Sequence, residues 1–314
     1  MFKSKSSDPS IEWLARSWIG STYTLLDRRD LLPAIRRQIT EYLEQKLVLY
    51  HSDKPPFYPE NLFKDRKIIK KIEDNLSSSH SGLLIPVRGG FLIKIRSDEP
   101  NTRKRFSIAH EIGHTFFFDL NPEIPTRIFN RTRYWVEEDF ANFIAGVILL
   151  PESSLRKTLL KEEFSPSLES LAQLAQLYTV SQDVLCRRLV KQLHLWDCLL
   201  FKSVIESDGT IKTDSSSVSK GTSYESWTIP KLLVNKNQKA PSSSLPFGKN
   251  RINPIQSFLV SAITKATSNS RDEKKKDCSE FHYGGNTYSI QSRIAMKRKL
   301  SSCISLIRRK LPSS

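Results

Sequence analysis

Apolar residues recur at helical spacing in the first fifty residues of the chain. Leu32, Ile35, Ile39, Leu43 and Leu47 follow one another at intervals of three and four, which places them on one face of a helix. The pattern therefore predicts a helical N-terminal part that packs one apolar stripe against a core.

Two short apolar and β-prone runs follow, at residues 83–87 and 91–95, with Arg88-Gly89-Gly90 between them. Such runs around a Gly-Gly pair are typical of a β-hairpin. The charged stretch from Lys64 to Glu73 is expected to form a short helix before the hairpin. Together these segments predict a small sheet among helices, and hence an α+β domain.

Helical periodicity returns after the hairpin. Residues 101–118 and the strongly apolar residues 134–150 each predict a helix, and Pro151 ends the second one. Between them, residues 119–133 lack periodicity, and a loop of about 15 residues in a compact region is often functional. Residues 168–193 predict two short helices separated near Thr179-Val180-Ser181.

Positive charge is concentrated in the C-terminal third. The chain carries 49 Lys+Arg against 33 Asp+Glu, and 20 of the former but only 8 of the latter lie in residues 200–314. We therefore predict three parts: residues 1–167, a helical pair at 168–196, and a basic, partly flexible region of unknown fold at 200–314. Within the last part, residues 290–311 are expected to form an amphipathic basic helix.

Some classes of protein are excluded by what the sequence lacks. It contains no run of about 20 apolar residues, so no transmembrane segment is expected. The N-terminus, MFKSKSSDPS, has no apolar region typical of a secretory signal. Four cysteines without a CxxC pair do not predict a disulfide framework. We expect a soluble, cytoplasmic protein with reduced thiols.

The sequence His110-Glu111-Ile112-Gly113-His114 is an HExxH motif within a predicted helix. Histidines at positions i and i+4 share a helical face, where both imidazoles can hold one metal ion. Glu111 can then accept a proton from the metal-bound water, whose pKa zinc lowers to about 7. The motif therefore predicts a metal site that activates water.

A catalytic zinc takes three protein ligands, and HExxH supplies two. The next predicted helix begins with Glu137, Glu138 and Asp139. We favour Glu138 as the third ligand, because it shares a face with small residues such as Ala141 that allow the two helices to approach closely. Glu137 and Asp139 are expected to be solvated charges near a helix N-terminus.

The segment from Arg105 to His114 resembles the active-site helix of the ImmA/IrrE family of metallo-endopeptidases. The stretch Glu138-Asp139-Phe140-Ala141-Asn142, followed by Leu149-Leu150-Pro151, is similar to a second family pattern, whose Glu is the third zinc ligand. Residues 171–189 are similar to the helix-turn-helix-like region of the family. The resemblance covers roughly residues 80–196 and does not extend to residues 200–314.

The resemblance implies a zincin-like peptidase domain and a site-specific endopeptidase. His110, His114 and Glu138 would hold zinc, or manganese, which also suits this ligand set. Glu111 would be the general base, and the protein substrate would be a repressor or antitoxin-like transcription regulator. In zincins, a strand before the active-site helix aligns the substrate, and residues 91–95 are the candidate here, unless they are only core hairpin. Tyr134 and Tyr178 are candidates for stabilising an oxyanion.

A competing hypothesis is a DNA-binding transcription regulator. Residues 168–193 would be its helix-turn-helix, with Arg187, Arg188 and Lys191 on the second helix. The basic C-terminal region could add weak nucleic-acid binding through counterion release. A third hypothesis is a binding module whose peptidase site stays dormant until a partner arrives.

Overall fold

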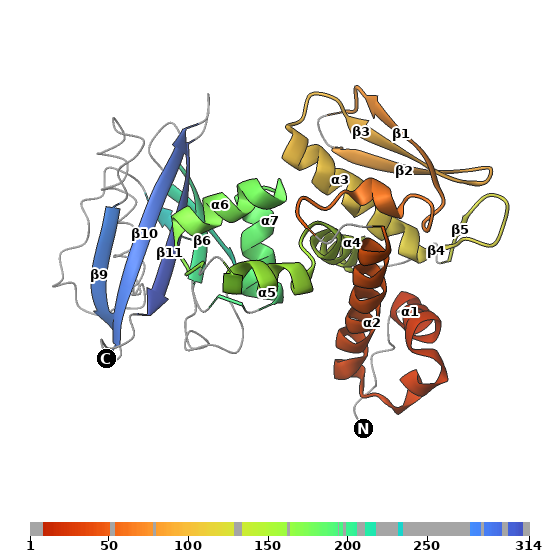
Figure 1. Ribbon diagram of the computed structural model, residues 1–314, viewed down its shortest axis with the longest axis horizontal. Coiled ribbons are helices and arrows are strands. Elements are labelled where there is room, and N and C mark those ends of the chain that lie inside the picture. The colour runs from red at the N-terminus through yellow and green to blue at the C-terminus, as the bar shows by residue number, and fades with distance from the viewer. Residues whose placement is uncertain are drawn as a thin grey trace. The chain divides into compact units, whose positions relative to one another are not determined.

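The computed structural model describes residues 9–50, 54–77, 80–128, 134–161, 164–193, 195–196, 199–205, 211–217, 232–234, 277–283, 286–296 and 301–309. Two compact units make up the chain, and Figure 1 shows the elements of both. The first comprises residues 1–161 and 175–181, and the second comprises residues 162–174 and 182–314. The domain boundaries expected after residues 167 and 196 stay predictions.

The first unit begins with helix α1 (Pro9–Ile19), the 3-10 turn η1 (Gly20–Leu25) and helix α2 (Arg28–Leu49). The predicted apolar stripe is buried along α2, where the exposed fraction is at most 1% at each of Ile35, Ile39, Leu43 and Leu47. At the start of the stripe, Leu31 rather than Leu32 enters the core. Helix α2 packs against helix α4 (Tyr134–Leu149), so the stripe supports the helix that carries Glu138.

A three-stranded sheet follows, with the order β1-β3-β2. Strands β2 (Gly82–Val87) and β3 (Gly90–Arg96) form the predicted antiparallel hairpin. Strand β1 (Ile68–Asp74) pairs in parallel with β3, after the 3-10 turn η2 (Pro59–Leu62). The expected helix at residues 64–73 is therefore wrong, because non-local pairing with β3 decides the conformation of this stretch.

The central position of β3 changes the expected substrate strand. Both neighbours of β3 are strands of the same sheet, so residues 91–95 cannot pair with a substrate, and that expectation is wrong. Their side chains Phe91, Ile93 and Ile95 are buried and face helix α3 (Asn101–His114). Among the described strands, β2 pairs only with β3, and it also lies against α3.

Helix α3 continues through the 3-10 turn η3 (Thr115–Phe117) into a two-stranded ribbon, β4 (Phe118–Asp119) and β5 (Thr126–Arg127). The chain then enters α4 and α5 (Glu152–Lys161). Gly113 lies directly against Ala141, since a Cβ added to this glycine would lie 2.7 Å from the Ala141 Cα. Helices α3 and α4 thus touch at backbone distance, as the small residues predicted.

The second unit contains most of α6 (Leu168–Tyr178), then α7 (Gln182–Cys186) and a π-helical segment η4 (Arg187–Gln192). The two predicted helices in this region are confirmed as elements of secondary structure. Among the helices of the described part of the chain, none has the length and apolar character that a membrane crossing requires.

A six-stranded antiparallel sheet forms the rest of the described second unit, in the order β8-β7-β6-β11-β10-β9. The strands are β6 (Leu199–Ile205), β7 (Ile211–Ser217), β8 (Leu232–Val234), β9 (Asp277–Tyr283), β10 (Asn286–Met296) and β11 (Ser301–Arg309). The helix expected at residues 290–311 is wrong. Antiparallel pairing of β10 with β11, from Tyr288–Arg309 to Met296–Ser301, decides the conformation of this stretch.

Candidate metal centre

The two histidines of the HExxH motif lie one turn apart on α3 and point to the same place. Their Nε2 atoms are 3.0 Å apart, and each side chain keeps about 15% of its surface exposed. Spacing of i and i+4 along a helix explains this convergence. The pair therefore forms one side of a partly open polar site.

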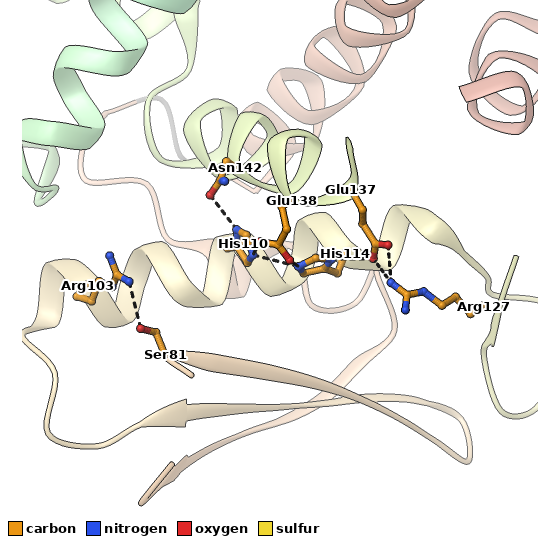
Figure 2. A network of polar contacts seen from close by, with 8 residues as sticks. All are labelled: Ser81, Arg103, His110, His114, Arg127, Glu137, Glu138 and Asn142. Atoms are coloured by element: carbon orange, nitrogen blue, oxygen red, sulfur yellow. Dashed lines mark hydrogen bonds and ion pairs between the residues drawn. The ribbon is translucent and has the colours of Figure 1, made fainter. Parts of the chain in front are cut away.

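Glu138 enters this site from α4 (Figure 2). Its carboxylate oxygens lie 3.3 Å from His110 Nε2 and 3.4 Å from His114 Nε2. Among the described residues, this trio forms a group of potential metal ligands, with one ligand atom from each within 4.8 Å of the others. The close contact of Gly113 with Ala141 brings α4 near enough for the Glu138 side chain to reach both imidazoles.

The second ring nitrogen of each histidine has its own partner on α4. His110 Nδ1 lies 3.1 Å from Asn142 Oδ1, and His114 Nδ1 lies 2.9 Å from Glu137 Oε1 (Figure 2). Since the partners are acceptors, the hydrogen is assigned to Nδ1 in both rings, which leaves the Nε2 lone pairs for a metal. Neither Glu137 nor Asn142 was assigned this role from the sequence.

These distances suit a single zinc ion. Three donors bonded to zinc at about 2.0–2.2 Å in tetrahedral geometry lie roughly 3.2–3.6 Å from one another, close to the separations of the His110, His114 and Glu138 donors. Two imidazole nitrogens and a carboxylate oxygen are also the donor set of many zinc peptidases. The residues present therefore fit the metal that the motif predicts.

The expectation that Glu137 is a solvated charge is wrong. This residue is only 2% exposed, and its carboxylate binds the Arg127 guanidinium as well as His114 (Figure 2). Asp139 is indeed exposed, and forms an ion pair with Arg36 at 2.6 Å. An acidic residue in the first turn of a helix is usually solvated, but Glu137 is paired on one side with Arg127 of β5 and on the other with His114 of α3.

The protein groups at this site favour an added positive charge. Hydrogen bonds from His110 and His114 hold the pKa of Glu138 well below its usual range. Burial alone would lower the pKa of His114, but its hydrogen bonds to Glu137 and Glu138 raise that pKa to about 9. A site that stabilises a proton on an imidazole in this way also stabilises a cation among the same side chains.

Glu111 points from α3 toward the sheet and is only 7% exposed. Burial raises its pKa, against the opposing effects of His114 and His110 and of a hydrogen bond from the backbone N–H of Leu84. A Cβ added to Gly82 would lie only 2.6 Å from the Glu111 Oε1 atom. The carboxylate is thus held between its own helix and strand β2.

Other residues singled out from the sequence lie in different surroundings. Tyr178 is fully buried, and its hydroxyl bonds to Ser154 and Thr158, so it does not serve as an oxyanion donor. Arg188 is only 2% exposed and bonds to Gln192, so it does not present its charge to DNA. The side chains of Tyr134 and Lys191 lie outside the described residues.

Comparison with known proteins agrees with this geometry. Residues 69–190 match the Peptidase_M78 family, described as the IrrE N-terminal-like domain. The radiation response metalloprotease IrrE of Deinococcus radiodurans is 34% identical over 104 residues, which are 32% of this chain and 31% of that protein. The match thus spans about a third of the length of this relative.

One solved structure is similar over most of the chain. A Mycobacterium tuberculosis transcriptional regulator superposes with a TM-score of 0.50 and 13% identity, covering 87% of this chain and 76% of that one. At this identity the likeness concerns the fold alone. The family match includes the helix with the HExxH motif, and together with the similarity to IrrE it supports the assignment of residues 69–190, as a Peptidase_M78 domain, to the ImmA/IrrE family.

Proposed function

We propose that this protein is a zinc-dependent endopeptidase whose metal is held by His110, His114 and Glu138. The observation that carries the proposal is the convergence of the two Nε2 atoms and the Glu138 carboxylate, while Asn142 and Glu137 hold the opposite ring nitrogens. The metallopeptidase family of residues 69–190 supports the same chemistry. Manganese is the alternative metal, and elemental analysis distinguishes the two.

The proposed mechanism assigns a separate role to each side chain. When bound, zinc would lower the pKa of a coordinated water to about 7 and polarise the scissile carbonyl. Glu111 accepts the proton of the attacking water and returns it to the leaving amine. Its raised pKa suits this exchange, because a base with a pKa nearer neutrality both takes and releases a proton readily.

Strand β2 is the proposed docking edge for the substrate backbone. It lies beside α3, and one of its sides is unpaired among the described residues. An extended peptide that adds to this edge gains main-chain hydrogen bonds and passes next to the motif helix. Pro86 lies on this strand, and proline is tolerated where no ladder hydrogen bond is required of its nitrogen.

The proposed substrate is a repressor or antitoxin-like transcription regulator, as the family resemblance implies, which would place the reaction in the cytoplasm. The burial of Arg188 weakens the alternative of direct DNA binding by residues 168–193, because it removes one of the three basic residues expected on the second helix.

Metal content is the decisive test of the proposal. We expect about one zinc per chain in the purified wild-type protein, and none in the His110→Ala/His114→Ala double variant. The measurement is elemental analysis after dialysis against metal-free buffer, with circular dichroism to establish that the variant is folded. Absence of metal from both proteins, even after zinc is supplied, would overturn the proposal. If the wild type binds zinc, the zinc-loaded protein is next incubated with repressor-like proteins encoded by neighbouring genes, in order to find the substrate.

A second expectation concerns Glu137. Glu137→Gln keeps the shape of the side chain but removes the charge that pairs with Arg127 and favours the hydrogen on His114 Nδ1. We expect zinc affinity to fall about 10–100-fold, as for other partners of ligating histidines. The measurement is competition with a chromophoric chelator. As control, Glu152→Gln removes an arginine-paired acid from the first turn of α5, and should leave the affinity unchanged.

A further inference from the structure

The outward edge of β2 can be assigned from its pairing with β3. Arg96 N–H donates to Ser81 O at 3.1 Å, so these two residues form a hydrogen-bonded pair. Gly82 lies opposite Ile95, which is the next pair along the two strands. Because backbone groups alternate between the two sides of an antiparallel strand, those of Gly82 and Leu84 point away from β3. Pro86, which lacks an N–H, occupies the next outward position, in agreement with this assignment.

The Glu111 carboxylate lies at this same edge. It accepts a hydrogen bond from the outward N–H of Leu84. It also fills the space that a side chain at position 82 would take, since a Cβ there would lie 2.6 Å from Oε1 and 3.1 Å from Cγ of Glu111. A real Cβ does not approach an oxygen that closely, so the position of this carboxylate depends on glycine at residue 82.

The beginning of β2 is tied to the start of α3, which fixes the strand relative to the helix. Ser81 Oγ donates to Glu99 Oε1 at 2.7 Å. Arg103 Nη2 donates to Ser81 Oγ at 3.2 Å (Figure 2). Glu99 is nearly buried and also pairs with Arg96 at 3.2 Å. Gly82, the next residue after Ser81, is therefore held in place against α3.

We propose that Gly82 and Leu84 are positioning residues for Glu111, so that the edge strand that aligns the substrate also fixes the general base. This inference rests on the proposed peptidase function. Glycine 82 supplies the room for the carboxylate, and the Leu84 N–H sets its direction. The substrate backbone can use the remaining outward groups of the same two residues, the Gly82 N–H and the two carbonyls, so a substrate that pairs in register lies next to the base.

A double-mutant cycle between Gly82→Ala and Glu111→Asp tests the contact. Gly82 has no left-handed φ, so alanine is compatible with its backbone. In the wild type, Gly82→Ala should displace the carboxylate and lower kcat about 10–100-fold, with zinc content and KM little changed. In the Glu111→Asp background the carboxylate is shorter by one methylene, and we expect the same change to lower kcat less than about threefold.

The same cycle has a readout that needs no activity. Gly82→Ala alone should lower Tm, because the added methyl overlaps Glu111, and Glu111→Asp should recover most of that loss. The control is Ile69→Ala, which changes a side chain that is 54% exposed on β1, the other edge strand of the same sheet. It should alter neither kcat nor the coupling.

A second variant pair tests the hydrogen bond. Leu84→Pro removes the outward N–H without removing a bond to β3, as the native Pro86 does two residues later, whereas Leu84→Ala keeps the N–H. With a quenched fluorescent peptide selected from a library by the zinc-loaded wild type, we expect Leu84→Pro to lower kcat about tenfold more than Leu84→Ala.

Additive Tm effects of Gly82→Ala and Glu111→Asp would overturn the proposal, as would equal kcat values for Leu84→Pro and Leu84→Ala. The proposed function fails separately. If the zinc-loaded wild type cleaves no peptide of the library, the peptidase assignment is wrong. The coupling in Tm still decides, in that case, whether Gly82 and Leu84 hold the Glu111 carboxylate.

Discussion

Glu111→Gln should lower kcat about 10²–10⁴-fold while the protein stays folded and retains its zinc, because general base catalysis contributes that much to such reactions. Glutamine has the same shape as glutamate but does not accept a proton from the attacking water. None of the three proposed ligands is changed. Glu111 is nearly buried and its pKa is raised by that burial, so removal of its charge should not destabilise the fold.

The measurements are the rate at which the variant hydrolyses the peptide selected by the zinc-loaded wild type, its zinc content and its Tm. Glu123→Gln is a matched control, since Glu123 is an exposed acid that pairs with Arg88. Unchanged hydrolysis in Glu111→Gln would mean that another group activates the water. Loss of zinc in that variant would instead place Glu111 among the ligands and contradict the assignment of Glu138 alone as the third.

Glu138→Ala should abolish stable metal binding, with a fall in zinc affinity of more than about 100-fold, since even the partners of metal ligands contribute up to that much. The Glu138 carboxylate is the group that bridges the two Nε2 atoms from α4. Its lowered pKa shows how strongly both imidazoles interact with its charged form. Without it, two histidines on one helical turn would leave the metal with too few ligands.

Elemental analysis and chelator competition measure this effect, with hydrolysis as a second readout. The control is Asp139→Ala, because Asp139 is the next residue of α4 but is exposed and pairs with Arg36. It should bind zinc like the wild type. Equal zinc affinity in Glu138→Ala and the wild type would overturn the proposed ligand set. Glu137, the other carboxylate that contacts His114, would then be the candidate third ligand.

The parts of the site that sequence patterns predict are those set by local spacing. His110 and His114 share a face because of helical geometry, and the approach of α4 follows from the small residue at 141. The hairpin at residues 82–96 likewise follows from two β-prone runs and a Gly-Gly turn. Each of these features depends on residues close in sequence, or on one contact between two helices.

The features that sequence patterns missed depend on partners far along the chain. Residues 68–74 carry enough charge for an exposed helix, and only parallel pairing with β3 makes them a strand. Glu137 resembles a solvated acid at a helix start until Arg127 and His114 are seen to surround it. The contact between Gly82 and Glu111 could not be predicted, because the space beside a glycine that a distant side chain fills leaves no pattern in the sequence.

The backbone contact between Gly113 and Ala141 also bears on folding. His110 and His114 belong to α3, while Glu138 and both partners of the ring nitrogens belong to α4. A metal at this site is therefore a cross-link between two helices that are separate in sequence. By mass action it would stabilise the folded chain by about 4 kcal/mol when free zinc exceeds its dissociation constant a thousandfold. Zinc supply would thus control how much of the domain survives unfolding and degradation, in addition to whether it can react.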